Sequence, residues 1–129
     1  MIMKFISIKG AKPNPGHYSA ATIKGNLLFI SGQLPVDPFT GEGVSGDITA
    51  ETKQVLANLD HVLEAAGSKK EDIMKVTVYI SDISLWDTVN SLYKDYFGDH
   101  KPARAVVPTN KLHYGYKIEL DAIAFIDEA

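Results

Sequence analysis

The chain has 129 residues, a formal net charge of −3 and an apolar fraction of 45%. These values are typical of one globular domain with its own core, so we expect a single domain over residues 1–129. The acidic balance leaves no basic stripe for a nucleic acid. Because cysteine is absent, disulfides, thiolate metal sites and thiol nucleophiles are excluded.

The apolar runs of the chain are short. None approaches the roughly 18 residues of a membrane span. The apolar stretch at the N-terminus is also too short for a signal peptide and reads as part of a first strand over residues 1–10. We therefore expect a cytoplasmic protein.

The N-terminal third predicts extended structure and loops. Residues 11–16 contain two prolines and a glycine, which break any regular element. Residues 17–24 and 27–32 are extended runs joined at Gly25-Asn26, which predicts a β-hairpin. The turn-rich stretch of residues 35–46 predicts a long loop, and loops of this length in small domains are often functional.

Two helices and a strand follow. Asp47 is the expected N-cap of the first helix and Gly67 its end. Ser84 to Asp87 resembles a capping box that opens the second helix, and Gly98 closes that helix. The expected buried stripes are Val55, Leu56, Leu59, Val62, Leu63 and Ala66 on the first helix, Met74, Val76, Val78 and Ile80 on the strand, and Trp86, Val89, Leu92, Tyr93, Tyr96 and Phe97 on the second helix.

Two further strands, residues 102–107 and 117–125, complete an α+β pattern in which two helices cover one face of the sheet. The strand segments 27–30, 105–107 and 122–126 are nevertheless apolar on both faces. A sheet with one face in water should alternate between apolar and polar residues. Another copy of the chain is the simplest cover for the second face, so we expect a homo-oligomer.

Arg104 and Glu119 are opposite charges in these two C-terminal strands, where charges are disfavoured unless they are paired or functional. An arginine fork suits a carboxylate ligand, and a glutamate nearby can handle a proton or a water. A structural salt bridge between the two residues is the alternative, and the two residues alone do not decide between a site and a salt bridge.

Other candidate residues also have two interpretations. Ser31-Gly32 at a strand end can expose backbone N–H groups to a ligand or form an ordinary β-bulge. Tyr18 can offer its hydroxyl to a ligand or fill a sheet edge. His17 and His113 lie beside these segments and either line a pocket or sit on the surface. No histidine pair has metal-ligand spacing, so we expect no metal site.

Several motifs follow one another along the chain: Ser31-Gly32-Gln33-Leu34-Pro35-Val36-Asp37-Pro38, Thr40-Gly41-Glu42, Leu63-Glu64-Ala65-Ala66-Gly67, Pro102-Ala103-Arg104 and Ile118-Glu119-Leu120-Asp121-Ala122. With these motifs the chain resembles the RidA/YjgF family of reactive-intermediate (imine/enamine) deaminases, once labelled translation-initiation inhibitors. The resemblance is collinear over nearly the whole chain. It implies a chorismate-mutase-like fold with a mixed six-stranded sheet, assembled as a homotrimer in which the open sheet faces form a common core and ligand clefts lie between subunits.

The resemblance also implies an activity and its residues. The reaction is hydrolysis of 2-aminoacrylate or 2-aminocrotonate, through their 2-imino acids, to 2-oxo acids and ammonia, without metal or organic cofactor. Arg104 would bind the substrate carboxylate, Glu119 would position the attacking water, and Tyr18 would complete the catalytic set. Backbone groups at Ser31, Gly32 and Val106 would complete the pocket.

The chain departs from the family pattern at three places. His17 and His113 stand where family members usually carry proline, and Val106 stands where many have cysteine. A second interpretation of the same clefts is a regulatory trimer that binds a small carboxylate without turnover. An RNA-acting protein is a third interpretation, and the acidic charge balance opposes it.

Overall fold

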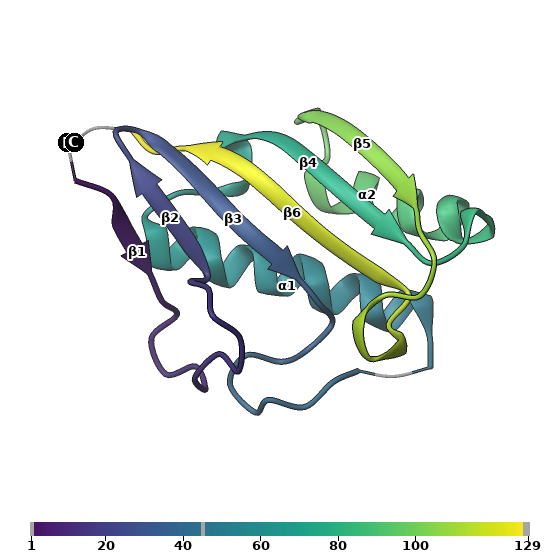
Figure 1. The fold of residues 1–129 in the computed structure, drawn as a ribbon. Coiled ribbons are helices and arrows are strands. Elements are labelled where there is room, and N and C mark those ends of the chain that lie inside the picture. The colour runs from purple at the N-terminus through teal and green to yellow at the C-terminus, as the bar shows by residue number, and fades with distance from the viewer. Residues whose placement is uncertain (1, 45, 128–129) are drawn as a thin grey trace.

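The structure is a computed structural model that describes residues 2–44 and 46–127. Its six strands form one mixed sheet in the order β1-β2-β3-β6-β4-β5, and the predicted α+β fold is confirmed (Figure 1). The expected first strand, loop 35–46 and domain limits include Met1, Ser45, Glu128 and Ala129, which lie outside the described residues. The elements are β1 (Lys4–Ile6), β2 (Ala21–Lys24), β3 (Leu27–Gln33), α1 (Ile48–Ala66), β4 (Ile73–Ile80), α2 (Trp86–Phe97), β5 (Ala103–Pro108) and β6 (Ile118–Phe125), with 3-10 turns η1 (Lys70–Asp72), η2 (Ile83–Leu85) and η3 (His113–Gly115).

The sheet is antiparallel except at one pair. The predicted hairpin is confirmed, since β2 and β3 pair antiparallel across Gly25-Asn26. β6 lies between β3 and β4 and is antiparallel to both. β4 and β5 are parallel, and α2 makes the crossover that a parallel pair requires. β5 is therefore an edge strand of the sheet.

Helix α1 begins and ends where the sequence predicts. The side chain of Asp47 accepts a hydrogen bond from the Thr49 N–H at 2.8 Å, as an N-cap does. Gly67 has a φ of 76°, a left-handed conformation that glycine adopts without steric cost. Five residues of the predicted stripe are buried, and Ala66 is partly buried against the same core.

Two predicted details are wrong. A register shift between Ile73 and Lys75 turns Ile73 into the core and leaves Met74 40% exposed. The capping box at Ser84 is replaced by Asp82, whose carboxylate accepts from the Ser84 N–H and caps the short turn η2, so that α2 begins only at Trp86. α2 buries Val89, Tyr93 and Phe97 of its expected stripe, while Trp86 stays exposed.

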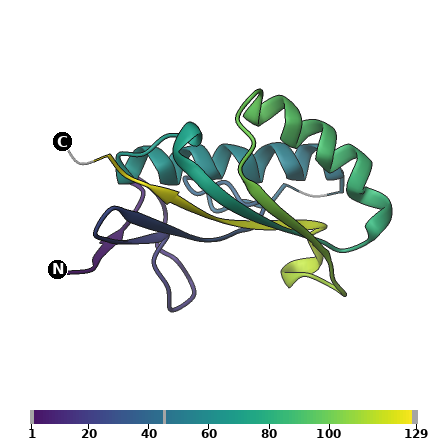
Figure 2. The same cartoon turned by 90° about the horizontal axis from the view of Figure 1, so that it is seen from above.

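Both helices cover the same face of the sheet, and the core lies between them and that face (Figure 2). The opposite face, called the open face below, carries no helix. Its apolar side chains come from β1, β3 and β6, as the doubly apolar strands predict: Phe5, Leu27 and Phe29 are exposed, and Ile123 and Phe125 are half-buried. None of the helices in the described ranges has the length and apolar character to cross a membrane.

Candidate functional site

A pocket of about 620 Å³ lies on the open face, at the end of β3. Figure 2 shows the loop before β2 and the turn η3 projecting from this side of the sheet, and the pocket lies between them. Gly32 of β3 and Glu119 of β6 form its floor, and the side chain of Glu119 lies on the open face. The lining residues are Pro15, Gly16, Tyr18, Ser31, Gly32, Leu34, His113, Tyr114 and Glu119.

A β-bulge shapes the floor. Ile30 pairs with Ala122 and Gln33 with Leu120, so Ser31 and Gly32 together face a single residue of β6. The bulge lets the carboxylate of Glu119 lie directly on Gly32. A Cβ at Gly32 would clash with Oε2 of Glu119 and come within 3.2 Å of its Cδ. Ser31-Gly32 therefore forms the β-bulge of the second interpretation, and this bulge lines the pocket.

Ser31 uses both of its hydrogen-bond donors within the chain. Its hydroxyl donates to the Ser19 carbonyl at 2.6 Å, and its N–H donates to the Ala20 carbonyl at 3.0 Å. These bonds hold the loop before β2 against β3. Ser31 thus lines the pocket and fixes its wall, and neither its O–H nor its N–H is free to donate to a ligand.

Glu119 is half-buried, and its environment opposes ionisation. Burial raises the pKa of Glu119, and the charge of Asp121 on the same face of β6 raises the pKa further. The positive charge of His113 partly offsets both effects by lowering the pKa. A carboxyl group with a raised pKa in a pocket is suited to act as a general acid or base.

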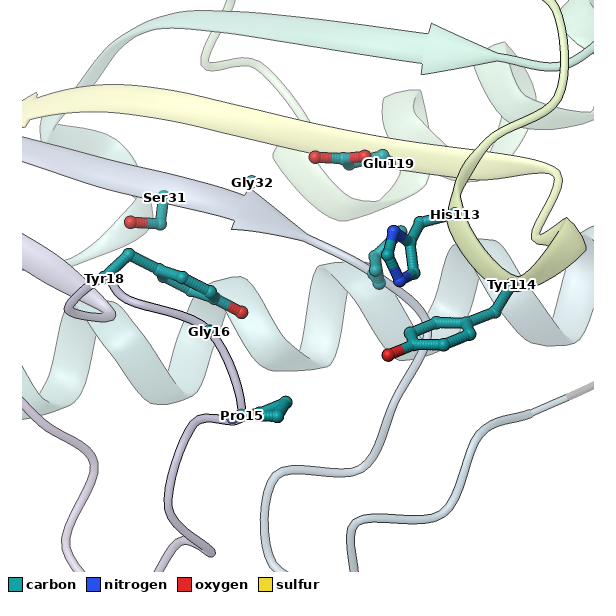
Figure 3. A pocket seen from close by; sticks show the side chains of 9 residues that line it. Pro15, Gly16, Tyr18, Ser31, Gly32, His113, Tyr114 and Glu119 are labelled. Atoms are coloured by element: carbon teal, nitrogen blue, oxygen red, sulfur yellow. The ribbon is translucent and has the colours of Figure 1, made fainter.

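Aromatic side chains and His113 surround this carboxyl group. In Figure 3 the hydroxyl of Tyr18 points into the middle of the pocket from one side, and His113 and Tyr114 approach from the other. The Tyr18 ring lies against Gly16, where a Cβ would come within 2.7 Å of the ring. His113 therefore lines the pocket, whereas His17 is not among its lining residues.

Arg104 lies elsewhere, on the helix side of β5. Its Nη1 donates to Oδ1 of Asn90 at 2.8 Å, and its guanidinium stacks over the Tyr93 ring at 4.8 Å. Burial raises the pKa of Tyr93 to about 12, although the charge of Arg104 lowers it. The Trp86 ring is a further neighbour, 6.0 Å from the guanidinium. Side chains of α2 therefore hold the guanidinium of Arg104 at the exposed edge strand β5.

Strand register explains why one chain separates Arg104 from Glu119. Arg104 pairs with the buried Val76, which faces the helices, whereas Glu119 pairs with Tyr79, which faces the opposite way. The two side chains lie on opposite faces, so neither the predicted joint site nor the alternative salt bridge forms within the chain. Val106 pairs with the buried Val78 and stays with Arg104. The expected site residues thus fall into two groups, Tyr18, Ser31, Gly32 and Glu119 in the pocket and Arg104 and Val106 on β5.

Two buried polar residues of α1 hold the pocket walls, and the sequence interpretation assigned them no role. Glu51, 1% exposed, accepts the Lys117 N–H at 2.8 Å and so anchors the chain just before β6. Asn58 donates to the carbonyls of Leu34 and Val36 and anchors the chain after β3. Asn90 was missed too, although its spacing from Trp86 and Tyr93 puts all three on one face of α2.

The pocket offers few ligands for a metal. One carboxylate and one imidazole line it, and no group of three or more metal-binding side chains occurs within the described ranges. A carboxylate on a glycine bulge, a tyrosine hydroxyl and an imidazole suit proton transfer to a small organic molecule instead.

Comparison with known proteins agrees with this arrangement. The family model described as Endoribonuclease L-PSP matches residues 10–126, which is most of the chain. The chain belongs to the Ribonuc_L-PSP/YjgF/RidA family. This membership confirms the resemblance read from the sequence motifs.

Other members of the RidA family match along nearly their whole length. A RutC family protein of Pyrococcus horikoshii is 47% identical over 124 residues, covering 95% of this chain and 98% of the relative. The human protein named 2-iminobutanoate/2-iminopropanoate deaminase is 40% identical, with 96% and 90% covered. The crystal structure of the YjgF gene product of E. coli has a TM-score of 0.87 and 40% identity, with 95% and 98% covered.

Proposed function

We propose that the protein hydrolyses reactive 2-imino acids, formed from 2-aminoacrylate and 2-aminocrotonate, to 2-oxo acids and ammonia. The observation that carries the proposal is the half-buried Glu119 carboxyl group held on Gly32 in a pocket open to a small molecule. Its family membership and the human, rat and bovine relatives with that deaminase name, each 40% identical, support this choice of reaction.

The complete site requires a second copy of the chain. The pocket around Glu119 has no arginine among its lining residues, and Arg104 sits at an exposed edge with its guanidinium held by Asn90. The exposed Phe29 and Leu27 on the open face give the copies an apolar surface to bury. In the proposed homotrimer, Arg104 and Val106 of one copy complete the pocket of Tyr18, Gly32 and Glu119 of the next.

The mechanism uses position and proton transfer. Arg104 binds the substrate carboxylate through its fork and fixes the C=N carbon near the pocket floor. Glu119 accepts a proton from a water as that water attacks the carbon, and the imine nitrogen takes up a proton, which gives a carbinolamine. The hydroxyl of the carbinolamine then gives up its proton, Glu119 returns its own proton to the nitrogen, and ammonia leaves from the 2-oxo acid. Imine hydrolysis proceeds in water unaided, so orientation and one base suffice to accelerate it.

The test generates 2-aminoacrylate in situ with a serine dehydratase and follows the loss of the imine. The wild-type protein should accelerate the loss, and Arg104→Ala should remove most of that acceleration because the carboxylate loses its anchor. Lys101→Ala, an exposed cation in the loop before β5, is the matched control and should be as active as wild type. No acceleration, or an undiminished one in Arg104→Ala, would exclude the deaminase.

The same experiment separates the other interpretations. Binding of a 2-oxo acid without turnover would favour a regulatory carboxylate-binding protein. The family model is described as Endoribonuclease L-PSP, which suggests RNA cleavage as another activity. A net charge of −3 does not favour binding of RNA. Negligible, salt-insensitive binding of RNA would exclude RNA as the substrate.

A further inference from the structure

His113 is built into the pocket wall beside Glu119. It opens the turn η3, whose central residue, Tyr114, has a φ of 58°, an uncommon conformation outside glycine. The His113 and Tyr114 rings meet edge to face, with centroids 3.8 Å apart. In Figure 3 the imidazole projects into the pocket between the side chains of Glu119 and Tyr114.

The imidazole is the only group among the pocket's lining residues that can carry a positive charge. The other ionisable groups around Glu119 are Asp121 on the same strand, Tyr79 on β4, and Tyr18 and Tyr114 across the pocket. Asp121 and Glu119 can carry only a negative charge, and a tyrosine cannot carry a positive one. Within one chain, His113 is thus the only lining side chain that can donate a proton as a cation and take it back as a neutral ring.

We propose that His113 is the acid–base partner of Glu119 in the reaction. The inference rests on the proposed function. Glu119 takes a proton from the attacking water while the imidazolium of His113 gives a proton to the imine nitrogen, so that the C–O bond forms and the C=N double bond becomes single. A side chain that only completed the turn would not need an ionisable ring in the same pocket as the carboxylate.

The second half of the cycle restores both groups. Neutral His113 takes the hydroxyl proton of the carbinolamine, and Glu119 returns its proton to the amino nitrogen. The C–N bond breaks with its electron pair on nitrogen, ammonia leaves, and the carbonyl forms. Water and imine are consumed, ammonia and 2-oxo acid are released, and the enzyme ends with Glu119 ionised and His113 protonated.

The test compares kcat of wild type and His113→Gln from pH 5 to 9, because the titration of the substrate cancels in their ratio. We expect wild type to be faster by about 10- to 100-fold at the acid end of this range, where the imidazole carries its proton, and the ratio to fall toward one as rising pH removes that proton. His61→Gln on α1, on the other side of the sheet, is the matched control and should give a ratio near one throughout.

A ratio near one at every pH, or a reduction that does not change with pH, would overturn the inference and leave the deaminase function standing. An inactive wild type would remove the proposed function and, with it, this inference. A second measurement is the pKa of Glu119 by carbon NMR, which should rise in His113→Gln because the positive charge beside it is lost. An unchanged pKa would contradict the pairing of the two groups.

Discussion

Gly32 and Glu119 depend on each other at the level of single atoms. The bulge at Ser31-Gly32 brings the strand backbone under the carboxylate, and only a residue without a Cβ leaves room for it. Gly32 does not have a left-handed backbone conformation that would require glycine. Glycine is needed at this position because the Glu119 side chain approaches the backbone closely. A tightly placed carboxyl group is what a reaction limited by orientation requires.

Gly32→Ala should displace the Glu119 carboxylate and lower kcat by about 10-fold or more, because misplacing a catalytic group by about 1 Å is costly. The fold should survive, since Gly32 is half-buried at the pocket floor and is absent from the core. The check is kcat beside the far-UV circular dichroism spectrum. Unchanged kcat in a folded variant would show that the carboxylate position is unimportant.

Asp121→Asn should extend activity to lower pH. Glu119 must be ionised to accept a proton, so activity is lost as pH falls through its pKa. The Asp121 charge raises that pKa, and its removal lowers it and moves the acid limb of the kcat profile downward. Asp99→Asn, in an exposed loop, is the control. An acid limb that stays in place in Asp121→Asn would contradict the role of Glu119 as base.

Much of the site could be predicted from residue type and position. Tyr18, Gly32 and Glu119 lie together as expected, and His113 joins them, because a bulge and two loops bring neighbouring strands into one pocket. The grouping with Arg104 within one chain could not be predicted. Side chains alternate between the two faces of a sheet, and the pairing register of β5 and β6 with β4 decides which face Arg104 and Glu119 take. The sequence of a single strand does not contain that register.

At the level of elements, α1 both covers the core and fixes the pocket. Its apolar stripe and both ends were predictable, since periodicity and capping are local signals. The register shift that exposes Met74 was not predictable, because it arises in the pairing of β4 with β6. Nor was the role of Glu51 or Asn58, whose partners lie 66 and 22–24 residues away in the chain.

Asn58→Ala should lower the free energy of unfolding by about 1–3 kcal/mol, because two part-buried carbonyls lose their donor. The measurement is the urea midpoint. Lys53→Ala, at an exposed position of the same helix, should change the midpoint little. A loss no greater than that of the control would mean that the loop after β3 does not depend on this anchor.

At the level of the whole molecule, the open face is the feature that one chain leaves unfinished. Phe29 is 46% exposed in the middle of an otherwise regular sheet. Apolar strands facing away from the helices predict a second copy on this face, and the same assembly would bring Arg104 of one chain toward the pocket of another.

Phe29→Glu should break the assembly, because burying an unpaired charge in an apolar interface is strongly unfavourable. Light scattering should give the mass of a trimer for wild type and that of a 14.1 kDa monomer for the variant. Ala65→Glu adds the same charge at an exposed position of α1 and should stay trimeric. A monomeric wild type would contradict the assembly.

The most direct test of a site shared between chains mixes two inactive variants, Arg104→Ala and Glu119→Gln, after separate unfolding and joint refolding. Random assembly pairs an intact Arg104 with an intact Glu119 in about a quarter of the interfaces, so about a quarter of the wild-type deaminase activity should return. Each variant refolded alone should remain inactive. A mixture as inactive as its components would contradict a site built from Arg104 of one copy and Glu119 of the next.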